Sequence, residues 1–223
     1  MREDEVAKLI DHTNLKPTAT TGDITNLCNE ARRYGFAAVC VNPYYVELAS
    51  KLLEGSGVKV CSVVGFPLGA TLKHVKATEA THVLEKGASE VDMVMNISAF
   101  KSRRYGEVKS DIEAVVEVCK SFNALCKVII ECCYLDDGEK RKAAELVVDA
   151  GADFVKTSTG LGPGGATVED VKLLKQAVEG RAYVKAAGGI RTLKDLLAMV
   201  EAGADRIGTS SGAKIAEELK AQK

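Results

Sequence analysis

The sequence predicts a single (β/α)8 barrel with parallel strands, in one domain over residues 1–223. Eight short β-rich runs alternate with longer amphipathic helical segments, which is typical of a parallel barrel. The phrases Glu-Lys-Gly-Ala and Ala-Gly-Ala precede strands at positions 85–88, 150–152 and 202–204, and they mark a repeated βα unit. No Ser/Gly/Pro-rich linker interrupts the series, so we place no domain boundary.

The predicted strands are mostly continuous apolar runs, as expected when both faces of a sheet are covered. They are residues 9–12, 37–41, 59–63, 91–95, 127–131, 153–156, 182–186 and 205–208. The helices between and after them are residues 23–34, 43–53, 71–86, 107–122, 137–150, 168–178, 193–201 and 213–220. Each strand is thus followed by one helix along the chain.

Start and stop signals support these helices. Pro43 stands at the first helical position, where its missing N–H is not needed. Val108, Ile112 and Val115 recur at helical spacing. Glycine follows several helices, as at Gly35, and supplies the left-handed residue that ends them.

A doubly wound open sheet is the main alternative fold. It should carry a glycine-rich sequence after its first strand. Here the first strand is followed by His-Thr-Asn-Leu-Lys-Pro at positions 12–17, which disfavours that fold.

Composition excludes several classes of function. Thirty basic and 31 acidic residues give a net charge of −1, so we expect no general attraction to nucleic acid or to an anionic membrane surface. No apolar stretch approaches the ~18 residues of a membrane span, and the N-terminus lacks an apolar signal core. The seven cysteines lack zinc-ribbon spacing and lie mostly in apolar surroundings, which indicates reduced thiols and a cytoplasmic protein.

Polar residues gather where the predicted strands end, which is where barrel enzymes place their catalytic groups. Two lysines, Lys156 and Lys185, end successive strands. A free lysine titrates near ~10.4, so a nucleophilic amine needs a pKa lower by roughly three, or about 4 kcal/mol. Two ammonium groups ~5 Å apart on neighbouring strands would repel by about 3 kcal/mol, and partial desolvation can supply the rest. The pair therefore predicts Schiff-base chemistry.

Asp92 is an acid inside an apolar strand, where burial is costly unless the carboxylate is paired. Near two lysines it could move protons or orient a water molecule. A purely structural ion pair is the alternative.

Glycine and serine segments after the last strands predict an anion site. Gly188 and Gly189 follow the seventh strand, and Gly208-Thr209-Ser210-Ser211 opens the last helix. Backbone N–H groups there can bind a phosphate, and the loops after strands seven and eight are its usual position in this fold. A flexible loop that begins at Gly160 adds a third glycine cluster. The histidines and carboxylates have no metal-ligand spacing, so we propose no metal.

Six segments together resemble the 2-deoxyribose-5-phosphate aldolase family. They are residues 10–13, 39–43, 65–69, 91–97, 154–160 and 184–190, and the resemblance runs from Ile10 to about Ser211. It implies a class I aldolase that reversibly cleaves 2-deoxy-D-ribose 5-phosphate to D-glyceraldehyde 3-phosphate and acetaldehyde. It also implies that no cofactor is needed and that the chain forms a homo-oligomer, a dimer or tetramer.

The resemblance also implies roles for individual residues. Lys156 matches the Schiff-base lysine, Lys185 the activating lysine and Asp92 the proton-relay acid. The matched phosphate site comprises Gly160, Gly188, Gly189, Ser210 and Ser211, and the matched pocket is lined by Asp11, Cys40 and Thr157. Longer members carry a C-terminal tail ending in tyrosine, whereas this sequence ends in Ala-Gln-Lys, so we expect water held by Asp92 and Lys185 to carry the proton.

Two other functions stay open from the sequence. One is another phospho-sugar enzyme on the same barrel, either a different Schiff-base aldolase or an isomerase. The other is a non-catalytic protein that binds a phosphorylated ligand.

Overall fold

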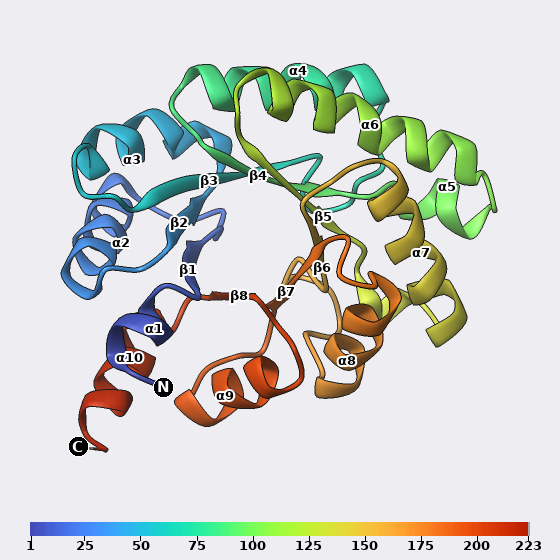
Figure 1. Cartoon of the computed structure of the whole chain (residues 1–223). Helices are drawn as coiled ribbons and strands as arrows, with labels where there is room; N and C mark the ends of the chain where they lie inside the picture. Colours follow the sequence, from blue (N-terminus) through green and yellow to red (C-terminus); the bar gives the residue numbers. More distant parts are fainter. Residues whose placement is uncertain (223) are drawn as a thin grey trace.

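The computed structural model describes residues 1–222 and forms a closed barrel of eight parallel strands in sequence order (Figure 1). The strands are β1 (Ile10–Asn14), β2 (Ala38–Val41), β3 (Lys59–Val64), β4 (Glu90–Val94), β5 (Leu125–Ile129), β6 (Phe154–Lys156), β7 (Tyr183–Ala187) and β8 (Arg206–Thr209). The predicted fold class is therefore confirmed. Position 223, the last residue of the predicted domain, lies outside the described residues.

Helices surround the barrel on its outer face (Figure 1). They are α1 (Glu3–Ala7), α2 (Thr21–Tyr34), α3 (Val46–Leu53), α4 (Lys73–Glu85), α5 (Ile97–Lys101), α6 (Tyr105–Ser121), α7 (Asp137–Asp149), α8 (Val168–Ala177), α9 (Leu193–Glu201) and α10 (Gly212–Lys220). Two short 3-10 helices, Pro43–Tyr45 and Cys132–Tyr134, follow β2 and β5. Among residues 1–222, no helix has the length and apolar character that crossing a membrane requires.

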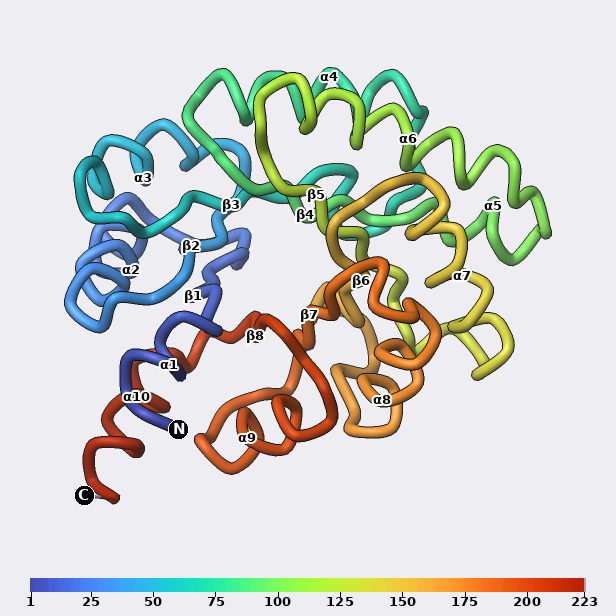
Figure 2. The backbone as a smooth tube through the Cα atoms, in the orientation of Figure 1, coloured from blue at the N-terminus to red at the C-terminus, as the bar shows by residue number. Residues whose placement is uncertain are grey.

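The five-residue helices α1 and α5 were not predicted, since five residues carry too little periodicity to be recognised. The helix predicted at 43–53 begins with the 3-10 helix Pro43–Tyr45 and continues as α3. Asn96, two residues after β4, caps α5, because its side chain accepts a hydrogen bond from the Ala99 N–H at 3.1 Å. The two ends of the described chain meet where α1 packs against α10 (Figure 2).

The strand predicted at 127–131 is shifted in the structure, since β5 begins at Leu125 and ends at Ile129. Glu131 lies beyond the strand in a left-handed conformation, with φ 53°. The apolar pair Ile129 and Ile130 continues the strand pattern in the sequence, but the strand ends at Ile129 although the Ile130 N–H still donates to the Lys156 carbonyl at 3.0 Å.

Most buried apolar side chains fill the layer between the strands and the helices. A small separate cluster of Ala38, Cys40, Cys61 and Val63 lies inside the barrel. Side chains alternate between the two faces of a strand, so the charged residues of several strands also enter the barrel interior. The apolar layer thus holds the strands that place these charges.

Gly69 shows how closely the loop after β3 packs against the end of β4. Its φ is +67°, and a Cβ atom there would collide with the carbonyl oxygen of Met95. Gly35, at the end of α2, has a similar φ of +69° but open space around the Cβ position. The two glycines therefore share a backbone conformation and differ only in their surroundings.

We predict that Gly69→Ala lowers the free energy of unfolding by about 3 kcal/mol, because the left-handed backbone penalty adds to a clash with backbone atoms. Gly35→Ala should lose only about 1 kcal/mol, the backbone penalty alone. Urea unfolding of both variants measures the difference. Equal losses would show that the loop after β3 is free to move away from β4.

Candidate active site

The barrel interior contains a network of charged side chains. Its members are Asp11, Glu90, Asp92, Lys127, Lys156, Lys185 and Arg206, and together they come from six of the eight strands. All except Arg206 are at most 3% exposed, and the Arg206 side chain is 13% exposed. Charges this deeply buried are tolerated only when they are paired and hydrogen-bonded.

Asp92 is the centre of this network. Its Oδ2 accepts hydrogen bonds from Lys156 Nζ and Lys185 Nζ, each at 2.7 Å. Its Oδ1 accepts from Lys127 Nζ at 2.9 Å. Burial alone would raise the pKa of Asp92, but the three lysines outweigh burial and hold that pKa well below its usual range. Asp92 is therefore a carboxylate at neutral pH.

Lys185 is held as an ammonium group. It is fully buried and forms ion pairs with Asp11 and with Asp92. Burial lowers its pKa, but the two carboxylates outweigh burial and the net pKa is raised. Lys156 and Lys185 are register partners on β6 and β7 and share one carboxylate oxygen, so their nitrogens lie no further apart than twice 2.7 Å. The close pair predicted from the sequence is present.

Three further charged side chains, Glu90, Lys127 and Arg206, belong to this network and were not predicted from the sequence. Arg206 Nε donates to Asp11 Oδ1 at 2.9 Å, and its NH2 group lies 3.1 Å from Glu90 Oε2. Lys127 Nζ lies 2.6 Å from Glu90 Oε2. Burial raises the pKa of Asp11, but Lys185, Arg206 and Lys127 lower it to about 2. One signal was available, because Glu90 stands two residues before Asp92 and therefore points to the same face.

The network holds more basic than acidic groups. Within residues 1–222, four basic side chains meet three carboxylates there. Lys127 and Lys185 each contact two carboxylates, and so does Arg206. Among the described residues, Lys156 forms an ion pair only with Asp92, whose Oδ2 it shares with Lys185. It is the cation that the carboxylates compensate least.

A cavity of about 420 Å³ opens at the C-terminal end of the barrel strands. Lys156 is the one lysine of the network in its wall. Six of the predicted site residues line this cavity, namely Lys156, Gly160, Gly188, Gly189, Gly208 and Ser210. A cavity of this size can hold a small phosphorylated ligand.

The other predicted site residues lie outside the cavity wall. Asp11, Cys40, Asp92 and Lys185 are fully buried in the barrel interior. Thr157 bridges β6 to β7, because its hydroxyl accepts from the Ala187 N–H at 3.1 Å. Ser211 directly precedes α10, and its N–H donates to Thr209 Oγ1 at 2.9 Å. Thr157 and Ser211 thus stabilise the segments that form the cavity wall without lining the cavity themselves.

Two cations in the cavity wall were missed in the sequence. Lys16 follows β1 and Arg191 follows β7, and both line the cavity beside the glycines. Neither side chain forms an ion pair with a carboxylate in the described part of the chain. Both lie in loops, where a lysine or arginine is usually just solvated, so the sequence carried no signal that separates them from other surface cations.

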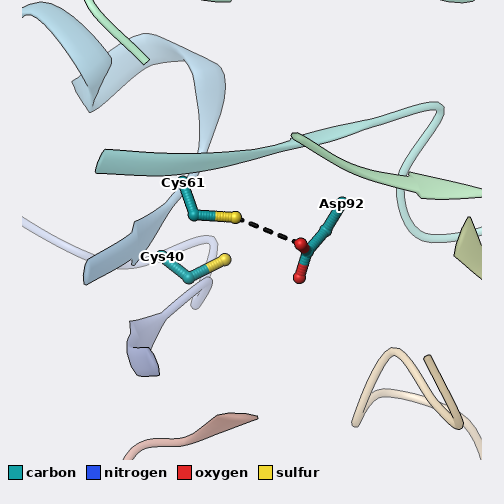
Figure 3. A group of neighbouring side chains, drawn as sticks. All are labelled: Cys40, Cys61 and Asp92. Carbon is teal, nitrogen blue, oxygen red and sulfur yellow. Dashed lines mark hydrogen bonds between the residues drawn. The ribbon is translucent and has the colours of Figure 1, made fainter. Parts of the chain in front are cut away.

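Cys40 and Cys61 face each other on β2 and β3 beside Asp92 (Figure 3). The Cys61 thiol donates to Asp92 Oδ1 at 3.2 Å. Burial raises the pKa of Cys61 well above its usual value, so it remains a thiol. The potential ligand atoms of these three residues lie within 4.8 Å of one another. However, Asp92 already binds three lysines, and the ammonium group of Lys185 would repel a metal cation, so we do not assign a metal here.

Comparison with known proteins identifies relatives over almost the whole chain. A family model described as DeoC/LacD family aldolase matches residues 5–217. The deoxyribose-phosphate aldolase of Thermococcus gammatolerans is 61% identical over 215 residues, which is 96% of each chain. That of Thermoanaerobacter sp. strain X514 is 59% identical over 214 residues, again 96% of each chain.

Solved structures agree with these sequence matches. An aldolase named QR15 superimposes with a TM-score of 0.93 at 47% identity, covering 97% of this chain and 96% of that one. A tetrameric deoxyribose phosphate aldolase from Aeropyrum pernix has a TM-score of 0.93 at 40% identity, covering 100% of this chain and 94% of that one. The chain belongs to the DeoC/LacD family of aldolases.

Proposed function

We propose that this chain is a class I aldolase that reversibly cleaves 2-deoxy-D-ribose 5-phosphate to D-glyceraldehyde 3-phosphate and acetaldehyde. The observation that carries this proposal is the position of Lys156. Its amine reaches the wall of the cavity, whereas the ammonium of Lys185 lies buried behind it on the same oxygen of Asp92. The relatives named deoxyribose-phosphate aldolase support the choice of substrate.

The charge balance of the barrel interior supports an uncharged Lys156. Three buried cations, Lys127, Lys185 and Arg206, match the three carboxylates, and a fourth would leave an excess positive charge in a poorly solvated site. Lys156 is the lysine of this network that lines the cavity, so its amine is the one that a substrate can reach. A neutral amine still donates an N–H to Asp92.

In the proposed reaction, the lone pair of Lys156 attacks the aldehyde carbon of the open-chain sugar, and loss of water gives an iminium ion. The iminium accepts the electron pair of the breaking C–C bond, so that an enamine forms in place of an unstable carbanion. The hydroxyl proton of the departing glyceraldehyde phosphate goes to water held by Asp92 and Lys185. Protonation of the enamine and hydrolysis then release acetaldehyde and restore Lys156. No step requires a cofactor.

We expect the phosphate group at the glycine-lined part of the cavity wall. Gly160, Gly188, Gly189 and Ser210 lie there, and α10 starts directly behind Ser210 with its N-terminus. Exposed backbone N–H groups and a helix N-terminus favour an anion. Lys16 and Arg191 add positive charge. Phosphate binding at this wall would place the far end of the sugar at Lys156.

We also propose that the enzyme acts as a homo-oligomer in the cytoplasm. The tetrameric relative from Aeropyrum pernix supports an assembly of several copies. All seven cysteines are unpaired and six of them are buried, which fits a reducing compartment.

The direct test of the substrate is acetaldehyde release from 2-deoxyribose 5-phosphate, coupled to an alcohol dehydrogenase. We expect activity with this sugar and none with fructose or ribulose phosphates. Preference for either of those substrates would support a different phospho-sugar aldolase or an isomerase. Binding of glyceraldehyde 3-phosphate without turnover of any sugar would indicate a binding protein.

We predict that borohydride reduction in the presence of acetaldehyde adds one ethyl group, at Lys156. Mass spectrometry of a proteolytic digest locates the label. Lys156→Met should abolish it, whereas Lys172→Met, which removes an exposed lysine on α8, should leave it unchanged. A label at another lysine would disprove the assignment.

We predict that Lys185→Leu slows imine formation about 100-fold at pH 7, because loss of this cation favours the protonated form of Lys156 by about 3 kcal/mol. The pH–rate profile should move to higher pH. The double variant Asp11→Asn/Lys185→Leu removes one charge of each sign and should regain much of the trapping rate. An unchanged profile in Lys185→Leu would contradict the electrostatic explanation.

A further inference from the structure

Glu131 is a buried carboxylate that the mechanism above does not use. It is 2% exposed and belongs to no ion pair among residues 1–222. Its partner is Thr159, whose hydroxyl donates to Glu131 Oε2 at 2.5 Å. The Thr159 backbone N–H lies 3.2 Å from Oε1 and 3.3 Å from Oε2. A buried carboxyl group whose side-chain hydrogen bonds within residues 1–222 all come from one residue points to a specific local role.

The backbone of Glu131 is held in an unfavourable conformation. Its φ of 53° and ψ of 69° lie in the left-handed region, which a non-glycine residue rarely adopts. Such a conformation persists only where the surroundings enforce it. The next residue, Cys132, donates its N–H to the Thr157 carbonyl at 2.8 Å, so the turn after β5 is fixed directly to the segment after β6.

Thr159 passes this restraint to the next residues of the loop. Its Oγ1 accepts a hydrogen bond from the Leu161 N–H at 3.1 Å, which closes a turn around Gly160. Gly160 has a φ of +82°. A Cβ at Gly162 would lie 3.3 Å from Glu131 Cδ and 3.3 Å from Cys133 Sγ, so the loop rests directly against the Glu131 side chain.

The far end of the same loop is fixed to the loop after β7. The Ala166 N–H donates to the carbonyls of Ala187 and Gly188, at 3.1 and 3.0 Å. Thr159, Gly160 and Gly188 line the cavity, whereas Glu131 does not. Glu131 therefore lies behind the wall that faces the proposed phosphate position.

We propose that Glu131 is a positioning residue for phosphate recognition. Its carboxylate holds Thr159, and through Thr159 the turn at Gly160, so that the backbone of this turn faces the anion. The inference rests on the proposed function, because it assigns the phosphate to this wall. It makes Glu131 a determinant of affinity for the phosphorylated end of the substrate, with no part in the bond-breaking step.

The test compares 2-deoxyribose 5-phosphate with unphosphorylated 2-deoxyribose, measuring kcat and KM for each. Glu131→Ala should raise KM for the phosphorylated sugar about 10-fold, with kcat within about twofold. For the unphosphorylated sugar, kcat/KM should change less than about twofold. Glu131→Gln should show a smaller effect, because its amide can still accept the Thr159 N–H. Thr159→Val, which keeps the backbone N–H and loses the hydroxyl, should also raise KM for the phosphorylated sugar.

Glu79→Ala is the matched control. Glu79 accepts the Gly65 N–H at 2.8 Å, so it ties a different loop to a carboxylate. This variant should change kcat/KM for the phosphorylated and the unphosphorylated sugar by the same factor. Thermal denaturation establishes which variants are folded. If Glu131→Ala does not fold, the KM values of Glu131→Gln and Thr159→Val test the proposal in its place. An equal loss of kcat/KM for both sugars in the Glu131 variants would overturn the proposal. An unchanged KM for the phosphorylated sugar in every folded variant would overturn it as well.

Calorimetric titration with inorganic phosphate separates this proposal from the proposed function. Wild-type protein should bind phosphate about 10-fold more tightly than Glu131→Ala. That result would support the role of Glu131 even if no sugar were cleaved. Equal phosphate affinities would overturn it even if the wild-type enzyme were active.

Discussion

The arrangement of the barrel interior depends on one carboxylate. Asp92 accepts hydrogen bonds from three lysines of three other strands, and it is fully buried. Removing it would leave these lysines with too few carboxylates in a fully buried region, a change that usually costs several kcal/mol. Asp92 thus serves folding and the proposed chemistry together, since the same contacts place Lys156 at the cavity and keep Lys185 behind it.

Burying this many charges gives little stability, because the cost of removing them from water roughly cancels their attraction. In other proteins, replacing a buried ion pair with apolar residues of similar volume is often neutral or stabilising. The network therefore makes sense as a device for setting charge states. In the proposed mechanism, the carboxylates keep Lys127, Lys185 and Arg206 protonated, and the remaining amine becomes the nucleophile. The phosphate wall lies in separate loops, so substrate affinity can vary without disturbing this balance.

Much of this arrangement could be predicted from the sequence because strand ends and strand periodicity are local features. Lys156 and Lys185 each end an apolar run, and register partners on adjacent strands must lie close together. Arg206 and Glu90 were missed because their contact spans the barrel, and only closure of the sheet between β1 and β8 brings Asp11 beside them. Glu131 was assigned to a strand because the residues before it are apolar, and nothing local reveals its left-handed turn. Asp11, Cys40 and Thr157 were expected in the pocket wall, but the depth of a side chain depends on how far each strand extends.

The central claim concerns the proton count on three buried lysines, and neutron diffraction measures it directly. Crystals of the unliganded protein, grown in heavy water near neutral pH, would show the deuterons on each Nζ atom. If Lys156 is the uncharged nucleophile, it should carry two deuterons, and Lys127 and Lys185 should each carry three. Three deuterons on Lys156, with Asp92 ionised, would contradict it.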